Sequence, residues 1–208
     1  WRQKSKAIAE YFKYYRSSPT LWRWLWVLLT FKVADGLAGP LLKPLMVDLG
    51  LSFSQIGVYV TMLGAFAALL GAGLAGGLLK MMRRSQALWL FSGLKIISLA
   101  AYAWLAYQYD QQHAVSTVVI YAINAAEDAV SAMLLVVMLT LVMQYSRAEF
   151  AATDFTFQVA VMATVSGVLY SLSGLIGDVL GYTNYLFLIV FIAIFCLVTI
   201  FRWAEFEK

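Results

Sequence analysis

The chain has 208 residues, of which 62% are hydrophobic and 12% charged, with a formal net charge of +4. A soluble domain of this length could hardly keep so apolar a composition in solution, which excludes a water-soluble globular protein. The basic residues fall mainly in segments between apolar runs, so the positive charge indicates membrane topology rather than nucleic-acid binding.

Residues 1–20 precede the first apolar run and are basic and polar. Residues 5–16 carry one apolar helical face, which consists of Ile8, Tyr11, Phe12 and Tyr15. This pattern predicts an amphipathic helix on the cytoplasmic head groups, and it is equally compatible with a partly ordered linker to preceding membrane helices. We therefore expect a cytoplasmic interdomain linker over 1–20 and a transmembrane bundle over 21–208.

Six apolar runs follow, each long enough for the roughly 20 residues that a helix needs to cross a bilayer. They cover residues 21–46, 54–80, 86–109, 115–145, 155–180 and 183–203. Ser18 with Pro19 predicts the start of the first helix, and Ser52 with Gln55 predicts a capping box at the second. The sequence thus predicts an all-α polytopic membrane protein with six transmembrane helices.

Basic residues mark one side of this bundle. Lys and Arg precede the first run, follow the second, fourth and sixth runs, and are absent from the segments 48–52, 110–114 and 181–182. Because Lys and Arg accumulate in cytoplasmic loops, both termini are expected to be cytoplasmic.

The two halves of the unit are weakly alike in their glycines. The second run ends in Gly71, Gly73, Gly76 and Gly77, and the fifth in Gly167, Gly174, Gly177 and Gly181. Small residues allow close helix contact in membranes. The pattern favours two inverted three-helix repeats, as in transporter halves, although glycine is also simply frequent in such helices.

The first run carries a polar stripe in an apolar helix. Its members are Lys32, Asp35, Gly36, Gly39 and Lys43. At 1.5 Å per residue, Lys32 and Asp35 lie about 15 to 20 Å from the cytoplasmic interface, near the midplane. They can form an ion pair that only holds the bundle together. Alternatively, a proton on Asp35 frees Lys32 to attract an anionic solute, in which case Asp35→Asn would abolish proton-driven accumulation.

The fourth run supplies a matching stripe at the same depth. It contains Thr117, Tyr121, Asn124, Asp128 and Ser131, with Glu127 at its margin. Neighbouring residues on a helix point about 100 degrees apart, so at most one carboxylate faces a cavity squarely. The stripe favours Asp128 for that position, and Glu127 is then free to pair with Lys95 of the third run, which is expected to balance charge.

The fifth run is rich in hydroxyl and amide groups, among them Gln158 and Tyr170. Such groups fit a cavity wall, and hydrogen bonding between helices explains about half of them equally well. Asp154 can cap the start of this helix, and we expect Asp154, Arg83 and Arg84 to serve structural charge pairing.

Short strings in the chain resemble a known family. Phe31-Lys32-Val33-Ala34-Asp35-Gly36 resembles the opening of the seventh helix in major facilitator superfamily permeases of the AmpG muropeptide type. Two further strings are similar to the RhtX/FptX siderophore-importer branch, namely Arg83-Arg84-Ser85-Gln86-Ala87-Leu88 and Ala151-Ala152-Thr153-Asp154-Phe155-Thr156. The resemblance covers about Trp22 to Trp203, the C-terminal six-helix half of such a transporter.

The resemblance implies proton-driven import of an amphiphilic solute, such as a siderophore or muropeptide, across a bacterial inner membrane. It implies a missing N-terminal six-helix half as partner, with the first, second, fourth and fifth helices lining the cavity and no cofactor beyond the proton gradient. The substrate and proton pathway would then run through Lys32, Asp35, Tyr121, Asn124, Glu127, Asp128, Gln158 and Tyr170. The Glu127-Asp128 pair departs from the muropeptide permeases, where an acidic residue and an asparagine are expected nearby.

The chain has few residues that could serve catalysis or bind a metal. An enzyme or metal centre is not expected, because the single histidine, His113, falls in a loop and Cys196 has no basic partner in the sequence. A structural or assembly subunit without transport, or an exporter of drugs or metabolites with the same fold, remains an alternative.

Overall fold

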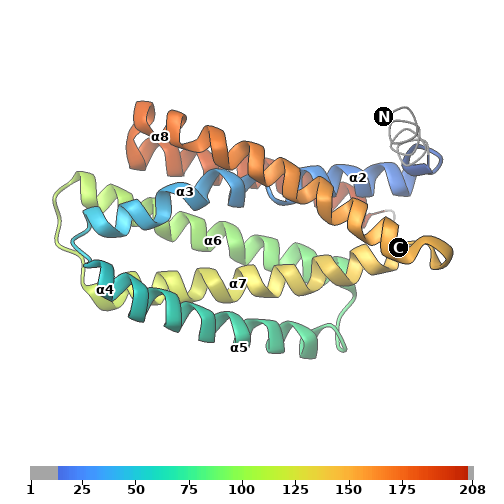
Figure 1. Cartoon of the computed structure of the whole chain (residues 1–208), viewed down its shortest axis with the longest axis horizontal. Coiled ribbons are helices and arrows are strands. Elements are labelled where there is room, and N and C mark those ends of the chain that lie inside the picture. Colours follow the sequence, from blue (N-terminus) through green and yellow to red (C-terminus); the bar gives the residue numbers. More distant parts are fainter. Residues whose placement is uncertain (1–13, 206–208) are drawn as a thin grey trace.

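The computed structural model describes residues 14–205, and this part of the chain consists of helices and turns without a strand. The helices run along the long axis of one elongated bundle (Figure 1). In chain order they are α2 (Pro19–Phe31), α3 (Val33–Asp48), α4 (Phe53–Gln55), the π-helix η1 (Ile56–Met62), α5 (Leu63–Leu78), α6 (Arg84–Asp110), α7 (Thr117–Gln144), the 3₁₀ turn η2 (Ala148–Phe150) and α8 (Ala151–Ala204).

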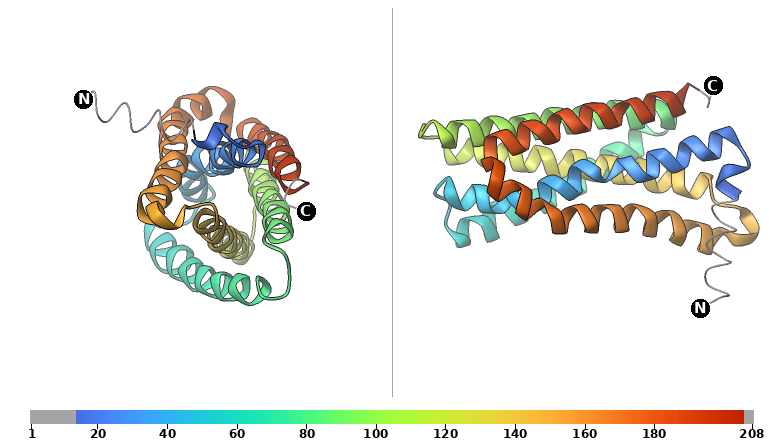
Figure 2. Two further views of the ribbon diagram at one scale, coloured as in Figure 1. Left: turned by 90° about the vertical axis from the view of Figure 1, so that its right-hand side faces the viewer. Right: turned by 90° about the horizontal axis from the view of Figure 1, so that it is seen from above.

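The last helix, α8, is a hairpin of two membrane-length limbs. Its backbone leaves helical geometry at Gly181, with φ 73° and ψ 166°, a positive φ that glycine adopts without strain. Beyond this residue the chain folds back along the first limb (Figure 2, right). Five stretches of helix are long and apolar enough to cross a membrane, and the last of them is the stretch that folds back at Gly181. The structure therefore has five to six helices that could span a membrane, where the sequence predicted six.

The start of α2 and the end of α8 lie at the same end of the bundle (Figure 2, right), as an even number of crossings requires. Ser18 precedes α2 with Pro19 in its first turn, and Ser52 and Gln55 form the predicted capping box at α4. The amphipathic segment predicted over 5–16 lies mostly outside the described residues. Tyr15, its last apolar member, is fully buried and stacks on Phe157 instead of facing lipid.

The first span is not the single helix that its periodicity predicted. It breaks at Lys32, where φ is −95° and ψ is 6°, so α2 and α3 are separate helices that end and begin beside this residue. The break has no signal in the sequence, because neither glycine nor proline stands at residue 32. The second span likewise opens with an unpredicted π-helix, in which the Thr61 hydroxyl donates to the Ile56 carbonyl.

Helix packing joins α5 to α7, α3 to α8, and α6 to both α7 and α8. Two glycines permit close approaches between the backbones of neighbouring helices. A Cβ on Gly71 would stand 2.3 Å from the Ala129 carbonyl oxygen, and one on Gly36 would stand 2.8 Å from the Ser166 carbonyl oxygen. The close-contact explanation therefore holds for Gly71. It does not hold for several other glycines of the two predicted sets, which have open space around them: Gly73, Gly76, Gly77, Gly167 and Gly174.

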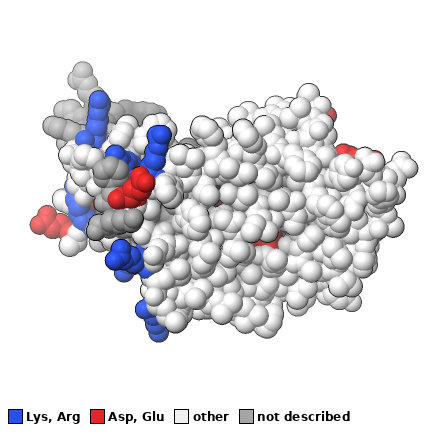
Figure 3. Space-filling model, turned by 180° about the vertical axis from the view of Figure 1, so that it is seen from behind, with Lys and Arg blue, Asp and Glu red and all other residues white. Residues whose placement is uncertain are grey.

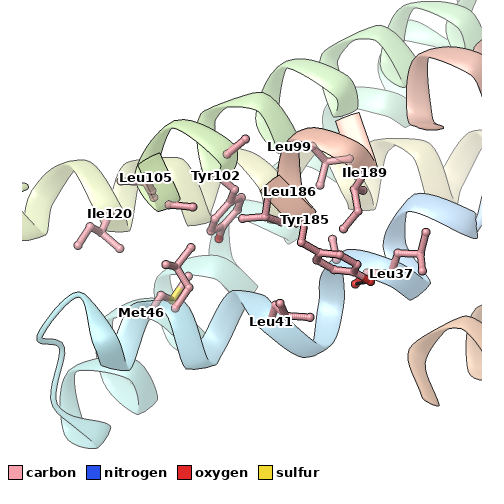
Figure 4. Packing of buried hydrophobic residues seen from close by; sticks show 14 of the residues in the cluster. Leu37, Leu41, Met46, Leu99, Tyr102, Leu105, Ile120, Tyr185, Leu186 and Ile189 are labelled. Carbon is pink, nitrogen blue, oxygen red and sulfur yellow. Dashed lines mark hydrogen bonds between the residues drawn. The ribbon is translucent and has the colours of Figure 1, made fainter. Parts of the chain in front are cut away.

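Two hydrophobic clusters fill the bundle, one toward each end. The first joins α3, α6, the start of α7 and the second limb of α8. Figure 4 shows its side chains meeting between these helices, with Leu41 and Met46 on α3, Leu99 and Tyr102 on α6, and Leu186 on α8. The second cluster lies at the end where α2 begins, around Trp24, Phe91, Leu141 and Trp203.

The basic end of the bundle departs from the expected charge pairing. Asp154 does form a salt bridge, at 2.8 Å to Arg147. Arg83 and Arg84, in contrast, form no salt bridge with any described residue. Arg84 donates instead to the side-chain oxygen of Gln144, and the backbone N–H of Arg83 donates to Gln86 at the start of α6. Neither arginine forms a salt bridge with a carboxylate of the described residues, and their pairing role stays a prediction.

Candidate functional site

A cluster of ionisable side chains lies between the two hydrophobic clusters. On α6, Lys95 falls between Phe91 of one cluster and Leu99 of the other. On α7, Glu127 and Asp128 lie between Ile120 and Leu134 in the same way. Each of these residues lies near the middle of its helix. The bundle therefore concentrates its charge about halfway between its ends.

Lys95 connects the two carboxylate-bearing spans. Its Nζ lies 2.8 Å from Oδ1 of Asp35 and also contacts Oε1 of Glu127. It donates a further hydrogen bond, of 2.6 Å, to the Ser131 hydroxyl. Asp35 receives a second cation, because Nζ of Lys32 lies 2.6 Å from its Oδ2. The chain of contacts Lys32, Asp35, Lys95 and Glu127 thus ties the first, third and fourth spans together.

This chain of ion pairs is not equally buried along its length. The side chains of Lys32 and Asp35 keep 28% and 25% of their surface exposed, whereas those of Lys95 and Glu127 keep 9% and 11%. Burying an unpaired charge is far more costly than burying a paired one, so the inner pair holds the helices together. The outer pair opens toward the surface of the bundle, where a solute or another helix layer can reach it.

Asn124 organises the second half of the site. Its side-chain oxygen accepts a hydrogen bond of 3.0 Å from the Tyr102 hydroxyl. Its Nδ2 donates to Oδ2 of Asp128, at 2.8 Å, and to the carbonyl oxygen of Val60, at 3.2 Å. Val60 lies inside the π-helix η1. One buried amide thus connects α6, the irregular turn of the second span and the Asp128 carboxylate.

Asp128 differs from the other two carboxylates in its neighbours. It is half-buried and forms no salt bridge with any residue between 14 and 205. It lies against α5 at Gly64, where a Cβ would come within 2.0 Å of Oδ2 of Asp128. The site therefore contains two lysines and three carboxylates, and Asp128 is the one of these carboxylates that forms no salt bridge within residues 14–205.

The expected division between Glu127 and Asp128 is present, although one member of the stripe belongs elsewhere. Glu127 pairs with Lys95, and Asp128 stays on the side of Asn124. Ser131 was grouped with Asp128, but its hydroxyl donates to Glu127 at 2.9 Å. The i,i+4 geometry of a helix joins 124 to 128 and 127 to 131, so the stripe splits into two hydrogen-bonded pairs.

Three other predicted pathway residues lie outside this cluster. Tyr121 stacks on Tyr59 with ring centroids 5.4 Å apart. Tyr170 is 56% exposed and lies beside Gly39 of α3. Tyr121 is half-buried and packs against the first hydrophobic cluster. A place in the pathway stays a prediction for both tyrosines.

Gln158 was predicted in the pathway, and its position contradicts that role. It is fully buried near the basic end of the bundle, where its side-chain oxygen accepts from Trp24 Nε1 at 2.6 Å. Its amide nitrogen donates to the Val142 carbonyl and to the Ser146 hydroxyl, both at 3.1 Å. Every polar atom of the amide is thus used to join helices, which leaves none for a solute.

The sequence interpretation missed Tyr102 and the π-helix. Tyr102 follows Lys95 by seven residues on α6 and so shares its face, a spacing that could have revealed it. The π-helix has no comparable signal. No cluster of three or more His, Cys, Asp or Glu suited to a metal ion occurs among residues 14–205.

A small cavity of about 40 Å³ adjoins Lys95, with Thr30 and Ser92 as its other polar lining residues. Its volume suits about one water molecule and no solute.

The fold and the site together define a helical integral membrane protein with charge buried between its spans. No family model matches the chain, and no solved structure matches it. An uncharacterized protein of Haemophilus influenzae (strain KW20 / Rd) is 26% identical over 170 residues, which are 80% of this chain and 40% of that relative. The chain thus spans less than half the length of the curated relative that it matches.

Proposed function

We propose that the chain forms half of a secondary active transporter of the major facilitator type, which moves an amphiphilic solute across the membrane with protons. The observation that carries the proposal is the ion-pair chain between Lys32 and Glu127 at mid-bundle depth, with Asp128 beside it. Ionisable residues inside membrane spans are expensive and typically mark solute or proton paths.

Asp128, rather than Asp35, is the group best placed to carry the proton. Asp35 is held between two lysine ammonium groups, which stabilise its ionised form. Asp128 has no cation in salt-bridge range within the described chain, and it reaches Asn124, whose amide also contacts the π-helix. Proton binding there would alter the hydrogen bonds of the second span. This revises the sequence-based expectation that Asp35 couples transport to protons.

The packing pattern supports an arrangement of inverted repeats. In such repeats the first span corresponds to the fourth, and the second span to the fifth. A contact between the first and fifth spans should therefore be matched by a contact between the fourth and second spans. The structure has both contacts, as α3 against α8 and α5 against α7. Repeats of this kind place a binding site near the midplane at the repeat interface, which is the depth of the charge cluster.

Lys32 fits recognition of an anionic solute. Its ammonium is the more exposed of the two lysines in the cluster, and its partner Asp35 keeps Lys95 when Lys32 turns away. A carboxylate or phosphate, as found in siderophores and muropeptides, could therefore replace Asp35 at Lys32 without leaving a bare charge behind.

Uptake by cells that express the full-length protein tests the proposal. Radiolabelled ferric siderophores and muropeptides should accumulate, and a protonophore should abolish the accumulation. Asp128→Asn should also abolish it, whereas Asp178→Asn, the same change at an exposed position of α8, should not. If every solute of the panel fails to accumulate, or if Asp128→Asn accumulates fully, the proposal is wrong. Accumulation of solute inside inverted vesicles, whose cytoplasmic face points outward, would indicate an exporter.

The buried pair of Lys95 and Glu127 favours a second candidate, a structural membrane subunit without transport. These side chains are almost fully enclosed and hold α6 to α7, a role that needs no solute. For such a subunit, Asp128→Asn would change assembly or stability while no solute gradient depends on it.

A further inference from the structure

A pocket of about 590 Å³ opens between α2 and the second limb of α8, at the end of the bundle where α2 begins and α8 ends. We call it the arginine–tryptophan pocket, and its lining residues are Trp22, Arg23, Trp26, Thr199, Arg202 and Glu205. None of them belongs to the charge cluster described above.

The polar and apolar parts of this pocket are separated along the bundle axis. The chain enters the bundle along α2 and leaves it along α8, so Arg23 and Arg202 come to similar heights near the helix ends. Trp26 and Thr199 lie three residues farther into the bundle, a distance of about 4.5 Å. The pocket thus has a cationic mouth and a less polar floor toward the middle of the membrane.

Two exposed indoles line the pocket. Trp22 and Trp26 are 39% and 49% exposed, and their rings meet edge to face at a centroid distance of 6.1 Å. Tryptophan is enriched at the boundary between head groups and acyl chains. This pair therefore places the pocket at that boundary.

The charge of the lining residues is +1, from two arginines and one glutamate. Arg202 is exposed and forms no salt bridge within the described chain. Lys and Arg side chains also gather at this end of the molecule on the face that Figure 3 shows, while the remainder of that face is nearly free of cations. A planar guanidinium pairs well with phosphate oxygens.

From these features we infer that the arginine–tryptophan pocket binds an anionic glycerophospholipid with a phosphatidylglycerol head group. The phosphodiester would lie between Arg23 and Arg202, and the glycerol hydroxyls would donate to Glu205. The acyl chains would run past Trp26 and Thr199 into the bilayer. A net charge of −1 on the lipid complements the pocket better than the zero net charge of phosphatidylethanolamine or phosphatidylcholine.

The test is native mass spectrometry of the delipidated full-length protein in detergent, titrated with dioleoyl phosphatidylglycerol, phosphatidylethanolamine or phosphatidylcholine. Phosphatidylglycerol should bind most tightly. Arg202→Gln should weaken its binding about fivefold, the effect of one basic residue near an anionic surface. Glu205→Gln, which removes a like charge, should strengthen it. Lys80→Gln is the matched control, because Lys80 is exposed at the same end and lies outside the pocket.

Three results would overturn the inference. They are equal binding of all three lipids, equal losses in Arg202→Gln and Lys80→Gln, and displacement of the lipid by inorganic phosphate at the same concentration. The last result would reveal a simple anion site. Arg202 and Glu205 are exposed residues, so their substitution leaves the bundle folded and the measurement interpretable. The inference does not depend on transport.

Discussion

Replacing Lys95 by methionine should destabilise the bundle more than any other single change in the charge cluster. The substitution keeps much of the side-chain volume and removes the ammonium that contacts Asp35, Glu127 and Ser131. Asp35 retains Lys32 as its cation. Glu127 is left buried without that cation, and it keeps the hydrogen bond that the Ser131 hydroxyl donates to it.

The size of the effect follows from that uncompensated carboxylate. Breaking a buried ion pair from one side costs about 3 to 5 kcal/mol. Removing both charges, in the double variant Lys95→Met/Glu127→Gln, eliminates the bare charge and should restore about 2 kcal/mol of that loss. Lys32→Met is the matched control. It makes the same chemical change in a more exposed pair whose carboxylate keeps a second lysine, and it should cost less than about 1 kcal/mol.

Unfolding of the purified protein in mixed detergent micelles, titrated with dodecyl sulfate and followed by circular dichroism, measures the wild type and the three variants. The reasoning fails if Lys95→Met is no less stable than Lys32→Met. It also fails if the double variant is less stable than Lys95→Met alone, because the loss would then come from packing and not from buried charge.

Two further substitutions test the packing. Gly71→Ala should destabilise the protein by about 1 to 3 kcal/mol, because the new Cβ would stand 2.3 Å from the Ala129 carbonyl oxygen. Gly73→Ala is the control: its Cβ meets open space, so it should be neutral or stabilising by up to about 1 kcal/mol. Equal effects of the two substitutions in the same unfolding titration would contradict the assigned contact. Gln158→Leu should cost about 1 to 3 kcal/mol, because it leaves the Trp24 indole N–H without its acceptor. Solute uptake per folded molecule should stay at the wild-type level in Gln158→Leu, and a selective loss of uptake would return this residue to the pathway.

The sequence predicted the position of the central charges along their helices and the pairing of Glu127 with Lys95. Run lengths fix where Asp35 and Asp128 lie along the membrane normal, since each helix rises 1.5 Å per residue. The 100 degree offset between neighbours also separated the positions of Glu127 and Asp128. These inferences needed only the geometry of single helices, which is why they could be made without knowing how the helices pack.

What the sequence could not supply was the identity of neighbours from other helices. The sequence shows that Gln158 is polar, which suggested a cavity residue. It does not show that Gln158 accepts a hydrogen bond from Trp24, 134 positions away. The salt bridge of Asp154 to Arg147, and the absence of one at Arg84 among residues 14–205, depend equally on tertiary packing. The backbone break at Lys32 has no glycine or proline at that residue to announce it. The π-helix over Ile56–Met62 was likewise not predicted from the sequence.

The central claim is that the charge cluster borders a water-accessible path in the assembled protein. Cysteine accessibility in intact membranes tests it most directly, in a full-length Cys196→Ser background labelled with a charged, membrane-impermeant thiol reagent. Tyr170 and Phe195 are both exposed in the bundle, at 56% and 73%, but only Tyr170 lies near the site. The account predicts labelling of Tyr170→Cys and protection of Phe195→Cys by lipid. Equal protection of both positions, from either side of the membrane, would contradict it.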